Sequence, residues 1–129
     1  MGRFRQLAVF DGDYATITVG LGPNDPLQSC VDQIPTNLIH DKWLCRTLPQ
    51  RLRRAGFEIV RCDAHPYISE GEASYFLTLI TRGADFLVKE GLISEQGAEA
   101  LKFEARARIE NDAFFGFISF NSVIARRPK

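Results

Sequence analysis

The last apolar stretch of the chain, residues 114–125, constrains the fold more than any other feature. It reads Phe-Phe-Gly-Phe-Ile-Ser-Phe-Asn-Ser-Val-Ile-Ala, with apolar side chains at both odd and even positions. Because successive side chains of a strand point to opposite faces, a strand of this composition is apolar on both sides. Such a strand belongs in the middle of a sheet that is packed on each face. The sequence therefore predicts that a terminal strand near 115–126 is the central strand.

Two earlier segments have the pattern of strands that could lie on either side of this terminal strand. Residues 7–10 form a short apolar run that predicts a strand near 6–10, and Asp11-Gly12-Asp13 after it predicts a turn. Residues 15–19 alternate as a short extended piece. Residues 57–64 also alternate, and their charged side chains indicate a position near the sheet edge. We expect a small mixed sheet in which the terminal strand lies between the other two and antiparallel to both.

The remaining chain has the pattern of helices that flank this sheet. Asn24 or Asp25 can cap a helix with Pro26 in its first turn, and Asp41 can cap a second helix that ends at Gly56. A helical hairpin is expected near 71–111, its second helix capped by Ser94. With no repeat, low-complexity tract or linker, residues 1–129 are predicted to form a single α/β domain.

Composition argues against several classes of function. Sixteen basic residues balance sixteen acidic ones and the pI is about 6.7, so neither nucleic acid nor an anionic membrane is an expected partner. Apolar runs are too short for a membrane span or a signal peptide, which predicts a cytoplasmic protein. The number of cysteines is odd, which predicts that Cys30, Cys45 and Cys62 are free thiols. No residues have the spacing of metal ligands, so no metal site is expected.

The order of these elements carries a resemblance to a known family. A first strand is followed by a loop with a helix, and then by a second helix that ends in Ala-Gly-Phe. A second strand, a helical hairpin and an aromatic terminal strand follow in turn. The segments that carry it are Gly2-Arg3 with Leu7–Tyr14, Trp43–Leu52, Arg54–Val60, Ser74–Phe115 and Phe114–Arg127. Together they resemble the C-terminal half of class I S-adenosylmethionine-dependent methyltransferases, in particular the ubiquinone and menaquinone biosynthesis group.

The resemblance implies the acceptor-substrate side of an enzyme that methylates a small organic molecule. In that family the cofactor is bound by the other half, through a Gly-rich loop after the first strand and an acidic residue after the second. Here the single Gly-x-Gly, Gly20-Leu21-Gly22, lacks this context, and loop geometry is the simpler interpretation. We therefore expect no cofactor-binding residues in this chain, no activity of the chain alone, and S-adenosylmethionine binding only if the missing half is supplied.

Several side chains are candidates for the acceptor site. His65 follows the strand at 57–64 and could act as a general base, and Asp13 could contribute a carboxylate, although Asp-Gly-Asp is also a common turn sequence. We expect Tyr14, Trp43, His65 and Tyr67 to line one apolar substrate pocket, since they lie at strand exits and in the adjoining insert. The alternative is that these aromatic residues belong to the core.

The first strand also predicts an interaction between chains. In the resembling enzymes the other half supplies a strand that pairs with it, and the apolar run at 7–10 contains no proline or lysine that would protect an open edge. A homo-oligomer through this strand is therefore expected. A different class of function stays open beside the enzyme: a non-catalytic module that binds a small apolar ligand or a protein partner.

Overall fold

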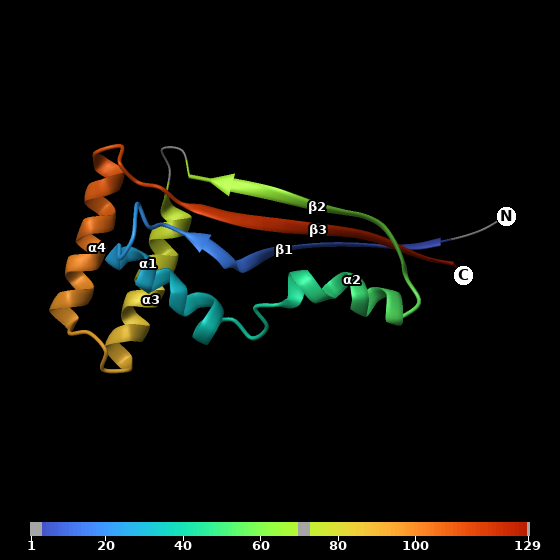
Figure 1. Cartoon of the computed structure of the whole chain (residues 1–129), viewed down its shortest axis with the longest axis horizontal. Helices are drawn as coiled ribbons and strands as arrows, with labels where there is room; N and C mark the ends of the chain where they lie inside the picture. The colour runs from blue at the N-terminus through green and yellow to red at the C-terminus, as the bar shows by residue number, and fades with distance from the viewer. Residues whose placement is uncertain (1–3, 70–72, 129) are drawn as a thin grey trace.

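The computed structural model describes residues 4–69 and 73–128. In chain order the elements are β1 (Phe4–Thr18), α1 (Pro26–Gln33), a π-helical turn η1 (Ile34–Leu38), α2 (Leu44–Arg54), β2 (Glu58–Ile68), α3 (Ser74–Lys89), α4 (Glu95–Glu110) and β3 (Phe117–Pro128). The strands form one three-stranded sheet. Figure 1 shows α1, α3 and α4 gathered at one end of the sheet and α2 lying along the rest of it.

The strand order is β1-β3-β2, so the last strand is central, as the two-sided apolar pattern predicted. β3 runs antiparallel to both neighbours, which confirms the expected α/β class and strand arrangement. Every strand neighbour in the described part of the sheet is antiparallel. The two ends of the described chain, Phe4 and Pro128, pair with each other at the end of the sheet away from α3 and α4.

β1 is much longer than the predicted strand at 6–10. The expected turn at Asp11-Gly12-Asp13 was wrong, because these residues stay in the ladder and face Asn121, Phe120 and Ser119 of β3. The separate extended piece at 15–19 is a continuation of the same strand, after a register shift between Asp13 and Thr18. An ion pair from α2 stabilises Asp13 within the strand, a contact that local turn propensity does not include.

β2 also continues past the predicted end at residue 64. His65, Pro66 and Tyr67 pair with Phe120, Ser119 and Ile118, so they lie within the strand and not in a loop after it. Pro66 is tolerated because β2 is an edge strand of the described sheet and one side of it makes no ladder bonds.

The helices agree with most of the predicted boundaries. Asp25 caps α1 by accepting a hydrogen bond from the Leu27 N–H, and Ser94 caps α4 by accepting one from Gly97. The expected cap of α2 was displaced: Asp41 accepts from the Trp43 N–H, and the helix begins only at Leu44. The hairpin is present as α3 and α4, while residues 70–72, where its start was expected, lie outside the described residues.

Two apolar clusters hold the fold together. The larger joins α1, α3 and α4 to the near end of the sheet and includes Leu27, Phe76, Ile80 and Ile118, all fully buried. The smaller packs Leu52 of α2 against β3. Among the described residues, no helix is long and apolar enough to cross a membrane.

Candidate functional site

The two faces of the sheet have different surroundings. Side chains alternate along each strand and paired residues share a face, so Val123 and Ala125, which pack against Leu52, mark the face covered by α2. We call the opposite side the open face; Phe120 of β3 and its neighbour Phe10 of β1 lie on it. Phe10 is 63% exposed, so α2 and the hairpin leave this part of the sheet uncovered.

Aromatic rings from four elements, β1, β2, β3 and α3, gather on the open face. Phe10 stacks on Phe120 with ring centroids 5.4 Å apart, and the His65 ring lies 5.6 Å from that of Phe10. Tyr67 of β2 packs edge-on against Phe120, and Tyr75 of α3 lies 6.3 Å from the same ring. We call Phe10, Tyr14, His65, Tyr67, Tyr75 and Phe120 the aromatic group; a partly exposed set of this kind can bind a flat, apolar molecule by stacking.

His65 is the titratable side chain of the aromatic group that suits proton transfer. Its Nε2 lies 2.8 Å from Ser122 Oγ, on the neighbouring strand β3. The pair is exposed, and an imidazole held by a hydroxyl can accept a hydrogen bond or a proton from a ligand hydroxyl. Sequence reasoning did not select Ser122, because only the strand register brings residues 57 positions apart into contact.

Tyr14 and Tyr75 form the inner part of the aromatic group. Burial and the neighbouring Tyr14 raise the pKa of Tyr75 to about 12. Gly12 makes room for this arrangement, since a Cβ there would lie 3.3 Å from the Tyr14 ring, the Phe120 ring and Ile118. The absence of a side chain in mid-strand thus lets β1 carry the tyrosine close to the centre of the sheet.

The Tyr75 hydroxyl should be detectable in an alkaline titration. Because the pKa of Tyr75 is raised in the folded state, its protonated hydroxyl stabilises the folded protein below the ordinary tyrosine pKa of 10. This contribution to the stability of the fold is lost as the pH rises towards 12. Tyrosinate absorbance should therefore show a component with a pKa of about 12 that the Tyr75→Phe variant lacks. A wild-type titration without that component would contradict the partly buried position of this hydroxyl beside Tyr14.

Asp13 and Trp43 lie on the face covered by α2, not with His65. The Arg46 Nε donates to Asp13 Oδ2 at 2.9 Å, and the same guanidinium lies over the Trp43 ring. Cys45 donates to the Gly12 carbonyl from the same helix. The prediction that all the candidates share one pocket was wrong: Tyr14, His65 and Tyr67 come together on the open face. The alternation of the strands places Asp13 on the other side, where it anchors α2.

The loop at Gly20-Leu21-Gly22 is stabilised by side chains of its own chain. The N–H groups of Val19 and Gly20 both donate to Gln28 Oε1, and that of Leu21 donates to Asp25 Oδ2. Three of the donors that a phosphate would need are therefore already bonded, one of them to a carboxylate that would repel an anion. These hydrogen bonds favour the interpretation that the two glycines allow the shape of the loop over the interpretation that they bind a nucleotide.

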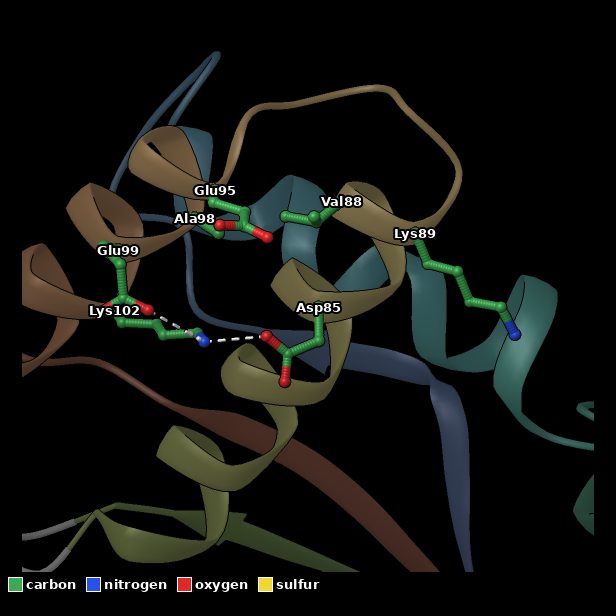
Figure 2. A pocket seen from close by; sticks show the side chains of 7 residues that line it. All are labelled: Asp85, Val88, Lys89, Glu95, Ala98, Glu99 and Lys102. Carbon is green, nitrogen blue, oxygen red and sulfur yellow. Dashed lines mark hydrogen bonds and ion pairs between the residues drawn. The ribbon is translucent and has the colours of Figure 1, made fainter.

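Two of the cavities formed by the described residues, both away from the aromatic group, adjoin helices. One of about 430 Å³ opens between α3 and α4, where the Lys102 ammonium bridges Asp85 and Glu99 while Lys89 points away from them (Figure 2). The other, about 250 Å³, lies between α2 and the sheet and is lined by Cys45 and Cys62 among others. Within residues 4–69 and 73–128, no three histidine, cysteine, aspartate or glutamate side chains gather as metal ligands.

The aromatic group is thus the best candidate site, with His65 and Ser122 as its polar part. Comparison of the chain with protein-family models, curated proteins and solved structures found no match.

Proposed function

We propose that this chain forms the acceptor-substrate side of an S-adenosylmethionine-dependent methyltransferase that acts on a small organic molecule. The observation that carries the proposal is the strand order β1-β3-β2 with the last strand antiparallel between its neighbours. It matches the order expected from the resemblance to the C-terminal half of these enzymes, and the hairpin of α3 and α4 corresponds to their helical insert. A fold-level likeness of this kind supports the function only by analogy.

The aromatic group provides the chemistry that an acceptor needs. Its rings offer stacking surface for an aromatic or unsaturated acceptor, and His65 beside Ser122 can accept a hydrogen bond from an acceptor hydroxyl. S-adenosylmethionine would supply the electrophilic methyl group. The described residues do not fit this cofactor, because the backbone donors of the one Gly-x-Gly loop are taken by Gln28 and Asp25.

The isolated chain is accordingly expected not to bind S-adenosylmethionine with useful affinity. Calorimetric titration should give no dissociation constant below about 10 µM, which corresponds to roughly −7 kcal/mol. Binding tighter than this by the isolated wild-type chain would contradict the assignment of the cofactor to another half.

Methyl transfer is the direct test of the proposal. We would express the chain together with any Gly-rich cofactor half encoded next to it, supply labelled S-adenosylmethionine and a panel of phenols and hydroxyquinones, and measure labelled product. Product should require both parts and should fall in a His65→Ala variant, while exposed Lys89→Ala on α3 serves as the control. Failure of every acceptor with a folded, cofactor-loaded complex would refute the function.

A non-catalytic ligand-binding module is the second candidate, favoured by the 63% exposure of Phe10 beside Phe120 and His65. Under this function the isolated chain binds apolar aromatic molecules with chemical-shift changes at the aromatic group, and no partner converts them. We also propose a cytoplasmic location, where reducing conditions keep the three cysteines as free thiols.

A further inference from the structure

The two edges of the described sheet differ in how well they are protected against pairing with another chain. β2 carries a bulge at Val60 and a proline at residue 66, and its charged residues Arg61 and Asp63 form an ion pair. Each of these features discourages strand addition. β2 is therefore a poor template for a partner.

β1 has neither a bulge nor a proline along residues 5–11, and its charged residues lie only at the two ends of this segment. Its ladder to β3 is regular from Phe4 to Asp13, and the run Leu7-Ala8-Val9-Phe10 is apolar without proline. In the described sheet β1 has β3 on one side only, so a row of backbone N–H and C=O groups faces outwards. An antiparallel strand could bond to this row without displacing any strand.

Charges at the two ends of this segment indicate which strand fits. Arg5 faces Arg127 across the ladder, and like charges in directly opposed positions repel each other. Among the described residues Arg5 makes no ion pair, while Arg127 lies over the Phe57 ring. At the other end, Asp11 faces the neutral Asn121. An incoming strand with an acid opposite Arg5 and a base opposite Asp11 would match both ends.

A second copy of residues 5–11 of β1 is a strand that carries an acid and a base at the matching ends. In an antiparallel pair of identical strands related by a two-fold axis at Ala8, residue i faces residue 16 − i of the other copy, an arrangement that follows from the symmetry alone. Arg5 then faces Asp11 of the second copy at both ends of the pairing. Leu7 faces Val9, and the small Ala8 lies at the axis, where the two chains approach most closely.

We propose that two copies of this chain pair through β1 in this register and form a continuous six-stranded sheet. Arg5 and Asp11 lie on the same face of β1, since both have odd positions in a regular strand, so each of the two symmetric ion pairs joins side chains of one face. This pairing does not depend on the methyltransferase proposal. A cofactor half that supplied a strand at the same edge would compete with it.

Light scattering on the full chain tests the state of assembly. At high micromolar concentration the mass should be 29 kDa, twice the 14.5 kDa of one chain, and should fall towards 14.5 kDa on dilution. Amide exchange in β1 should slow as the dimer forms, because the outward N–H groups become bonded. A mass of 14.5 kDa at every concentration would overturn the proposal.

A charge exchange tests the register. Arg5→Glu places an acid opposite Asp11 of the second copy, and Asp11→Arg places two arginines together, so each single variant should raise the dimer dissociation constant by about tenfold. The double variant restores opposite charges and should return the constant to near the wild-type value. Arg106→Glu on the exposed side of α4 is the control and should change nothing.

The single and double variants distinguish a wrong interface from a wrong register. If the single variants dimerise like the wild type, β1 is not the interface, and if the double variant fails to recover while staying folded by circular dichroism, the Ala8-centred register is wrong. Either result overturns the proposal. Neither bears on S-adenosylmethionine binding or methyl transfer, which are measured separately.

Discussion

Replacing Gly83 by alanine is expected to destabilise the protein by about 3 kcal/mol or more, in the upper range for overpacked sites. Gly83 lies within α3 where that helix crosses α1, and a Cβ there would lie 1.8 Å from the carbonyl oxygen of Cys30 and 2.5 Å from its carbonyl carbon. Both atoms belong to the backbone, so no rotamer change can relieve the contact. The two helices must separate, which opens the larger apolar cluster at its centre.

Urea unfolding of the variant checks this expectation through the shift of the transition midpoint. The matched control is Gly22→Ala, since nothing lies within 4 Å of a Cβ at that exposed loop position. If Gly83→Ala is as stable as Gly22→Ala, the close crossing of α1 and α3 is wrong.

The second large effect is expected at the ion pair between Asp25 and Arg108. The two terminal guanidinium nitrogens of Arg108, Nη1 and Nη2, donate to the two carboxylate oxygens of Asp25 at 2.7 and 3.0 Å. Both side chains are nearly buried, with Arg108 13% and Asp25 7% exposed. Arg108→Met leaves the carboxylate without its cation, which should cost about 3 kcal/mol. Arg106→Met, an exposed change on the same helix, should cost little.

This pair also predicts how stability depends on pH. The hydrogen bond from Arg108 is the largest cause that lowers the pKa of Asp25 to about 2, from an ordinary value of 3.8. Since the pKa is depressed in the folded state, the stabilisation, about 2 kcal/mol, is present above pH 3.8 and is lost as the pH falls towards 2.

Unfolding measured across this range should show a smaller acid dependence in the Arg108→Met variant than in the wild type. An unchanged acid dependence would mean that Asp25 is not held by Arg108. The pairing ties the start of α1 to α4, elements more than eighty residues apart.

The candidate site was predictable only in part. Tyr14, His65 and Tyr67 could be selected from residue type and position, and the structure brings them together. Phe10, Phe120 and Ser122 were not selected, because they join the group through the register of β1 and β2 on β3. Asp13 and Trp43 were placed in the same pocket by sequence reasoning and lie on the other face, where Arg46 contacts both.

The sequence by itself determined the central position of β3, the hairpin of α3 and α4, and the caps at Asp25 and Ser94. These features depend on local apolar period and on side chains that bond to nearby backbone groups, both of which are visible in a short window. The tertiary structure alone decided that β1 continues through Asp11-Gly12-Asp13 and that β2 continues through Pro66, because ladder partners on β3 and Arg46 of α2 outweigh local turn preferences. It also decided which side chains share a face, since that depends on the strand register and on the bulge at Val60, and a shift of one residue would exchange the two faces.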